Sequence, residues 1–327
     1  MAKILITGIT GFIGRNVLRE MLKSCPDFNI TALVRPKTDP KRYQEFEKAI
    51  RLVAIDLADT ASLKEFLFTN EFDTILHIGA LRGGRKFPQE TYLRSNVYST
   101  GQMVEYCLAK DARLIYCSSV GVFGAIPQEL PAGPQTEKNP DNYYHYTKIE
   151  SERIINRAIL NGLNAGIVRP SIAYGEGDFG FPYQMVKLVD KHLFPLINRP
   201  IWIHLCHIDA LVKAFLYLAT REWKSGLTLT VADREPVRLQ SLVDFISRQL
   251  HGKNYPRALR FDRIFFAWGE KLARLVKNEL WISRFELISK SWFYDVSAYY
   301  DIMEKEGYKS HFTIPEFEIT IKDYQKH

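Results

Sequence analysis

Tyr144 and Lys148, in the stretch YYHYTK, have the residue types and the spacing of an acid–base pair. Side chains four residues apart lie on one face of a helix. A lysine ammonium lowers the pKa of a neighbouring phenol, which lets the phenol exchange a proton near neutral pH. The spacing alone is unspecific, because it recurs at residues 106–110 and 183–187.

A serine pair favours Tyr144 over the other two tyrosines. The strand-like run LIYCSS ends in Ser118 and Ser119, and Ser119 lies 25 residues before Tyr144. A hydroxyl at this strand end can hydrogen-bond a substrate oxygen beside the tyrosine. Tyr106 precedes the strand and Tyr183 lies beyond the sheet. An aromatic residue on a helix face, without chemistry, is the alternative for Tyr144.

The stretch ILITGITGFIG places three glycines between a strand and a helix. Gly8 permits the tight turn, Gly11 lets backbone N–H groups approach a pyrophosphate, and Gly14 lets the helix pack close to the strand. The helix N-terminus adds partial positive charge. We expect a dinucleotide-binding turn that includes Phe12 and Ile13. A turn whose glycines serve geometry alone is the alternative.

The residues after the next two strands bear on the choice of cofactor. NAD-binding proteins usually place an acid after the second strand to hold the ribose hydroxyls. This chain has ALVRPK there, and Arg35 can pair with a 2′-phosphate, so we expect NADP in preference to NAD. Asp56 ends the third strand and can accept from the adenine amino group, with Leu57 against the ring. Asp56 can also cap the following helix.

The elements that must position these groups alternate between strand and helix. Near-continuous apolar strands in such an alternation indicate the α/β class, with a Rossmann-type doubly wound parallel sheet. The strands are expected over residues 3–7, 29–34, 51–55, 74–78, 113–117 and 165–169, and the helices over 15–23, 62–69, 95–110 and 144–161.

The pattern changes after Gly175, where Pro, Phe and Trp become frequent and helices dominate. We expect a dinucleotide-binding domain over residues 1–175, to which 203–232 return. Segments 176–202 and 233–327 are expected to form a smaller, mostly helical substrate-binding region. It would cover the carboxyl ends of the strands, where ligands bind in such sheets.

The segment RIFFAWGEKLARLVK, residues 263–277, carries an apolar stripe along a helix. Such a helix can lie on a membrane surface. We favour a core-facing helix of the substrate region, since that is the usual role of an apolar stripe. The stripe comprises Ile264, Phe265, Trp268, Leu272, Leu275 and Val276, and the cations elsewhere are Arg263, Lys271, Arg274 and Lys277.

Composition excludes several classes of protein. The 327 residues carry a net charge of +7, but no block of Lys and Arg, so we expect no nucleic-acid partner. No apolar run of about 18 residues is present, and no signal peptide precedes the first strand. Four scattered cysteines indicate thiols in a reducing compartment rather than disulfides or a zinc site. We expect a cytoplasmic protein without a metal.

Jointly, these motifs resemble the extended short-chain dehydrogenase/reductases, the superfamily of NAD-dependent epimerases and dehydratases. The resemblance covers nearly the whole chain. It is carried by TGITGFIG, IDL at Asp56, HIGA at 77–80, SNVYST with Asn96, CSSVGVFG with Ser119, Tyr144 and Lys148, RPSIAYGEGD at 169–178, and HID at 207–209.

The resemblance implies a role for each matching residue. Ser119, five residues before Gly124, would be the catalytic hydroxyl, Tyr144 the general acid/base, and Lys148 the partner of the nicotinamide ribose. Ala80 would lie along the cofactor. The remaining implied cofactor residues are Asn96, which steadies the strand of Ala80 or a water chain, and Pro170 and Ile172, which cover the nicotinamide. The family also implies a homodimer.

Departures from subfamily patterns narrow the reaction. Sugar-nucleotide 4,6-dehydratases carry Thr-Asp-Glu where this chain has Ser119, Val120 and Gly121, so no acid/base for water elimination is evident. Sugar-nucleotide epimerases usually carry Asn where this chain has Ile172. We therefore expect an NAD(P)-dependent oxidoreductase acting on a secondary alcohol or ketone of a small-molecule substrate. A nucleotide-sugar epimerase, a 3β-hydroxysteroid-dehydrogenase-like or flavonol-reductase-like enzyme, and a non-catalytic NADP sensor are the alternatives.

Overall fold

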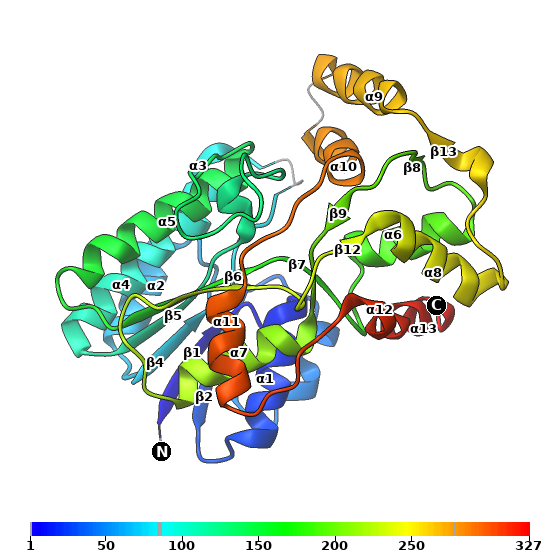
Figure 1. Ribbon diagram of the computed structural model, residues 1–327. Coiled ribbons are helices and arrows are strands. Elements are labelled where there is room, and N and C mark those ends of the chain that lie inside the picture. The colour runs from blue at the N-terminus through cyan, green and yellow to red at the C-terminus, as the bar shows by residue number, and fades with distance from the viewer. Residues whose placement is uncertain (1, 84–86, 277–278) are drawn as a thin grey trace. The chain divides into compact units, whose positions relative to one another are not determined.

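The computed structural model describes residues 2–83, 87–276 and 279–327 (Figure 1). The chain divides into two compact units, each assembled from separate segments. The first comprises residues 1–122, 140–169 and 211–229, and the second comprises 123–139, 170–210 and 230–327.

A seven-stranded sheet organises the first unit, in the order β11-β6-β5-β4-β1-β2-β3. The pairs β1–β2, β1–β4, β2–β3, β4–β5 and β5–β6 are parallel. The order reverses at β1, which places the topological switch between β1 and β4. The strands are β1 Lys3–Thr7, β2 Asn29–Val34, β3 Arg51–Ala54, β4 Thr74–His77, β5 Arg113–Cys117, β6 Ala165–Pro170 and β11 Thr228–Val231.

Helices lie on both faces of this sheet (Figure 1). On one face, apolar side chains of α2, α4 and α5 pack with those of the strands into one buried cluster. The doubly wound parallel fold predicted from the sequence is therefore confirmed. The helices of this unit are α1 Phe12–Ser24, α2 Thr60–Phe68, α3 Gln89–Tyr92, α4 Ser99–Lys110, α5 Tyr143–Ile159 and most of α7 Ile208–Thr220.

The second unit is mostly helical and contains short strand pairs. Its strands are β7 Ile172–Tyr174, β8 Leu196–Ile197, β9 Trp202–Ile203, β10 Leu205–His207, β12 Val237–Arg238 and β13 Arg260–Phe261. Its helices are α6 Phe181–Asp190, α8 Leu239–His251, α9 Arg263–Leu275, α10 Glu279–Ser289, α11 Ser297–Lys305, α12 Thr313–Glu316 and α13 Glu318–Gln325.

A buried polar network fastens the C-terminal helices within the second unit. Asp233 accepts hydrogen bonds from the Tyr174 hydroxyl at 2.9 Å, the Thr313 hydroxyl at 2.6 Å and the His207 backbone N–H at 2.7 Å. Burial raises the pKa of Asp233 to about 6. Three donors thus satisfy a carboxylate that would otherwise be costly to bury.

The prediction that the stripe of residues 263–277 faces the core is wrong. Five of its six apolar side chains are more than 60% exposed, and Phe265 is 45% exposed. The buried residues of α9 are Phe266 and Ala273, which occupy a different face. Lys277 lies outside the described residues. In the described parts of the chain, no helix is long and apolar enough to cross a membrane.

Candidate active site

The glycine turn connects β1 to α1 with backbone packed too closely for side chains. Gly8 has a φ of +82°, and a Cβ there would lie 2.6 Å from the Gly79 nitrogen. A Cβ on Gly14 would lie 2.3 Å from the Gly8 oxygen. Gly11 caps α1, and its N–H donates to the Gly8 oxygen at 3.0 Å. A turn of bare backbone at a helix N-terminus fits a dinucleotide pyrophosphate. Phe12 and Ile13 form the first turn of α1.

Two arginines that the sequence analysis did not select lie at this turn. Arg42 donates from Nη2 to the Thr10 oxygen at 2.6 Å, inside the glycine turn. Arg15 donates in turn to the Arg42 oxygen at 2.8 Å. Arg42 belongs to a one-turn helix, Pro40–Arg42, that periodicity does not reveal. Arg15 and Arg42 therefore bring positive charge to the glycine turn, in addition to the charge expected from Arg35.

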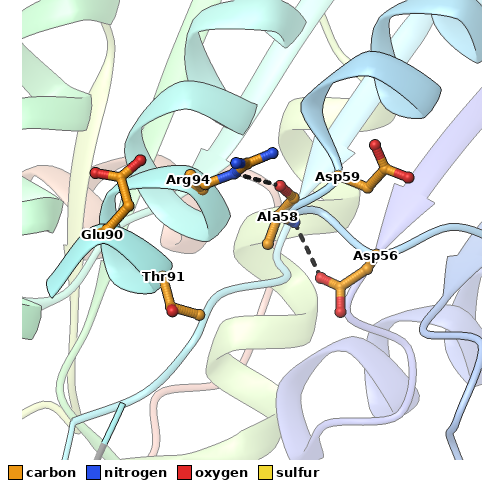
Figure 2. Close-up of a pocket in the computed structure, with 6 residues that line it drawn as sticks. All are labelled: Asp56, Ala58, Asp59, Glu90, Thr91 and Arg94. Carbon is orange, nitrogen blue, oxygen red and sulfur yellow. Dashed lines mark hydrogen bonds between the residues drawn. The ribbon is translucent and has the colours of Figure 1, made fainter. Parts of the chain in front are cut away.

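Asp56 and its neighbours line a pocket in the first unit (Figure 2). Asp56 accepts from the Ala58 N–H at 2.9 Å, and Arg94 donates to the Ala58 oxygen at 2.9 Å. Asp59, not Asp56, caps α2 by accepting from the Ser62 N–H, so the capping alternative for Asp56 is wrong. The other residues of this pocket are Glu90 and Thr91.

Leu57 follows β3, and Ala80 follows β4 next to Gly79. A Cβ on Gly79 would lie 3.1 Å from the Leu57 side chain, which shows how closely Leu57 approaches the end of β4. Asn96 is buried, accepts from the Leu81 N–H at 2.7 Å, and donates to the Leu81 oxygen at 3.0 Å. Asn96 therefore fixes the backbone at Leu81, next to Ala80.

Asn96 also joins this strand end to α5. It lies in a π-helical turn, Leu93–Tyr98, and donates from Nδ2 to the Thr147 hydroxyl at 3.0 Å. The Thr147 hydroxyl donates to the backbone carbonyl oxygen of Tyr144 at 2.7 Å. π-helical turns are rare and frequently occur at functional sites. The side-chain amide of Asn96 thus binds the backbone of Leu81 after β4 and the hydroxyl of Thr147 on α5.

Tyr144 and Lys148 lie on α5, which begins at Tyr143 because Asn142 caps it by accepting from the His145 N–H. The Lys148 ammonium is buried, donates to the Cys117 oxygen at 2.6 Å, and lies 5.9 Å from the centre of the Tyr144 ring. The end of β5 therefore holds the ammonium close to the phenol.

The pKa of Tyr144 differs from the expectation. Desolvation by surrounding protein raises the pKa of this phenol above its ordinary value, and Lys148 lowers it only in part. Desolvation disfavours the charged phenolate, whereas a nearby cation favours it. In this structure the first effect is the larger, so Tyr144 holds its proton at neutral pH.

The two serines after β5 have different partners. The Ser118 hydroxyl donates to Glu152 at 2.6 Å, and Glu152 accepts two further bonds from Arg169 at 2.8 Å each. Ser118, Glu152 and Arg169 are all buried. The Ser119 hydroxyl is partly exposed and accepts from the Gly121 N–H at 3.0 Å. Ser119 is therefore the serine whose hydroxyl remains available to a substrate.

An oriented imidazole beside Tyr144 was missed by the sequence analysis. His145 Nδ1 is hydrogen-bonded to Asp141, and the Asn142 amide lies 2.9 Å from the same nitrogen. The ring approaches Gly121 so closely that a Cβ there would lie 2.2 Å from His145 Nε2. A carboxylate that accepts from Nδ1–H leaves Nε2 as the unprotonated nitrogen of the neutral ring. The sequence signal was the Asp-x-x-x-His spacing immediately around Tyr144.

Gly121→Ala is expected to displace the His145 ring, because the added Cβ and the imidazole cannot share this space. The melting temperature should fall by several degrees, and turnover should fall with it. In a His145→Ala background the same substitution should have little effect, since the obstructing ring is gone. Melting temperatures and kcat of the four proteins measure this coupling. Equal losses in both backgrounds would show that Gly121 is required for another reason.

The remaining predicted residues lie in the second unit. Pro170 ends β6 and is buried, and Ile172 begins β7 and is partly exposed. Their placement over the nicotinamide stays a prediction.

The fold and the glycine turn are those of nucleotide-binding α/β proteins. A match to a family model shows to which family within this class the chain belongs. Residues 4–226 match the model of the NAD dependent epimerase/dehydratase family. The match spans more than half of the chain. The protein therefore belongs to the NAD-dependent epimerase/dehydratase family, and the predicted resemblance is confirmed.

Curated relatives are about a quarter identical to this chain over the residues that match. A trifunctional UDP-glucose 4,6-dehydratase/UDP-4-keto-6-deoxy-D-glucose 3,5-epimerase/UDP-4-keto-L-rhamnose-reductase of Arabidopsis thaliana is 27% identical over 229 residues, 65% of this chain and 33% of that protein. A UDP-glucose 4-epimerase of Caenorhabditis elegans is 27% identical over 214 residues, 58% of this chain and 61% of the relative. The matches thus span less than two thirds of either relative.

Solved structures share the fold. A UDP-glucuronic acid 4-epimerase from Bacillus cereus, in complex with NAD, superposes with a TM-score of 0.76 over 99% of both chains. Its sequence is 17% identical, so the similarity concerns the fold.

The prediction of NADP is wrong. The family is NAD-dependent, and the structural neighbour from Bacillus cereus was solved with NAD. Arg35 is exposed just after β2, and a guanidinium there can donate to ribose hydroxyls as readily as to a phosphate. The missing acid after β2 was therefore a poor criterion for the cofactor.

Proposed function

We propose that this chain is an NAD-dependent oxidoreductase or epimerase that acts on a secondary alcohol or ketone of a nucleotide-linked sugar. The observation that carries the proposal is the buried Lys148 ammonium, held at the end of β5 beside Tyr144. Ser119 follows the same strand, and the glycine turn belongs to the same unit. The nucleotide-sugar substrates of the named relatives support the substrate class.

The glycine turn and Asp56 would hold the pyrophosphate and adenine of NAD, and Lys148 its nicotinamide ribose. When bound, NAD supplies hydride transfer at its nicotinamide ring. Tyr144 gives a proton to the substrate oxygen during reduction, and in the oxidation direction the phenolate left by that step takes the proton back. Ser119 donates a hydrogen bond to that oxygen and orients it. The raised pKa of Tyr144 suits it to donate, because the phenol is protonated at neutral pH.

Dehydration is a second candidate reaction, favoured by the Asp141–His145 pair. Loss of water from a keto sugar requires one group to take the proton next to the carbonyl and one to protonate the departing hydroxyl. The sequence suggested no such group at residues 120 and 121. His145 Nε2 approaches Gly121 from α5 and offers a base there.

The second unit, which contains most of the C-terminal region, would bind the substrate. The arginines of this region that could bind a diphosphate are Arg199, Arg234 and Arg238. Arg199 donates to the Ser289 oxygen, and Arg234 pairs with Glu304 at 2.8 Å. Arg238 lies over the Trp202 ring. These contacts argue for structural roles. A homodimer through residues 95–110 and 144–161 stays a prediction from the family.

Incubation of the purified protein with NAD and UDP-glucose, UDP-glucuronic acid or dTDP-glucose tests the proposal, with the products analysed by NMR. An inverted hydroxyl or a keto sugar is expected from at least one substrate. Loss of water would favour the dehydratase reaction. If all substrates remain unchanged and nucleotide-free secondary alcohols reduce NAD instead, the nucleotide-sugar assignment is incorrect.

A further inference from the structure

Helix α9 presents two separate apolar faces, and only one is covered within its own unit. Phe266 and Ala273 are buried, and a Cβ on Gly269, between them in sequence, would lie 2.6 Å from the Phe285 ring of α10. This inner face therefore packs against α10 at close range. The apolar stripe identified in the sequence takes no part in this packing of α9 against α10.

The other apolar face of α9 is exposed. At 3.6 residues per turn its side chains fall within about 120° of the helix circumference. Figure 1 shows α9 at the margin of the second unit, with α10 as its neighbouring helix. The side chains of this face, between 45% and 72% exposed, are Ile264, Phe265, Trp268, Leu272, Leu275 and Val276. Contiguous apolar surface of this kind marks an interaction site.

A band of cations runs along one edge of this face. Arg263 and Lys271 precede the stripe around the helix, and the Lys271 ammonium lies 5.3 Å from the centre of the Trp268 ring. Arg274 is paired with Glu270 and Glu286. Within the described residues, Arg263 and Lys271 take part in no ion pair, so their charges remain available.

We propose that the exposed face of α9 binds the surface of an anionic lipid bilayer. Apolar side chains with tryptophan on one face and Lys or Arg beside them are the features of a helix that lies in the interface. The apolar residues would enter the boundary of the acyl chains, while Arg263 and Lys271 meet the lipid phosphates. The net charge of +7 adds long-range attraction to a negative surface.

Charge argues against a second copy of the chain as the occupant. Two antiparallel stripes facing each other across a twofold axis perpendicular to the helices would bring two cationic bands together. The stripe itself contains no acid that would neutralise them. An anionic surface, by contrast, complements the band.

Sedimentation with phosphatidylcholine vesicles, with and without phosphatidylglycerol, tests the proposal on the full chain. The wild-type protein should pellet with the anionic vesicles and far less with the neutral ones. The double variant Trp268→Ser, Leu272→Ser should bind at least tenfold more weakly, because it loses two inserted side chains. Lys271→Gln should weaken binding about fivefold, and added salt should act in the same direction.

Leu193→Ser is the matched control, since Leu193 is 64% exposed in the same unit but lies outside α9. It should bind anionic vesicles like the wild type. Melting temperatures verify that each variant is folded. The proposal is overturned if the wild type does not bind anionic vesicles, or if the double variant binds them as tightly as the wild type does. Lipid-independent dimers that the double variant dissociates, without vesicle binding by the wild type, would assign the face to a second copy instead.

Discussion

Tyr144→Phe is expected to lower kcat by about 10²- to 10⁴-fold while leaving NAD affinity within about twofold of the wild type. The substitution removes only the hydroxyl that exchanges a proton with substrate. The ring remains in place over the Lys148 ammonium, whose bond to the Cys117 oxygen is untouched. Steady-state turnover of the substrate identified by NMR measures the loss, and a fluorescence titration measures NAD affinity.

Tyr146→Phe provides the matched control on the same helix. Tyr146 lies two residues further along α5 and is 38% exposed, so loss of its hydroxyl should change kcat by less than about twofold. Equal activity of Tyr144→Phe and the wild type would contradict the assignment of Tyr144 as acid/base. Equal losses in both variants would indicate a structural effect at the start of α5.

Gly14→Ala is expected to reduce NAD affinity at least tenfold and to destabilise the fold by roughly 1–3 kcal/mol. Its Cβ would lie 2.3 Å from the Gly8 oxygen, so α1 must move away from the turn. That movement takes the helix N-terminus from the position at which it would face the pyrophosphate. Calorimetric titration with NAD and thermal denaturation measure the two effects.

Gly101→Ala is the corresponding control. Gly101 lies within α4, and a Cβ there has no heavy atom within 4 Å. Alanine is the better helix former, so this variant should be more stable by about 0.5–1 kcal/mol and should bind NAD normally. Unchanged NAD affinity in Gly14→Ala would mean that the turn does not hold the cofactor.

Features that depend on local chemistry were predictable from the sequence. The strands of the sheet were placed within about one residue, because buried parallel strands are continuous apolar runs bounded by turns. The glycine turn was recognisable because close backbone packing requires missing side chains at fixed spacing, as Gly8 and Gly14 show. Such signals lie within a few neighbouring residues.

Features that depend on tertiary packing were not predictable. An apolar stripe looks the same whether it faces a core or solvent, and α9 already had its inner face covered through Phe266 and Gly269. His145 gained its significance from Gly121, 24 residues earlier in the chain. Asn96 was assigned a steadying role, but its bond to Thr147 depends on a π-helical turn. The prediction of NADP was wrong because an arginine at position 35 is compatible with both NAD and NADP.

The division of the chain into interleaved segments has a consequence for how specificity can be changed. The chain passes from one unit to the other at residues 122–123, 139–140, 169–170, 210–211 and 229–230. No single cut separates a complete nucleotide-binding unit from a complete partner. The second unit therefore cannot be exchanged between relatives as one contiguous cassette. Under the substrate-binding role proposed for the second unit, new substrate preferences would arise through point substitutions or through insertions inside individual segments, which leave all five crossings intact.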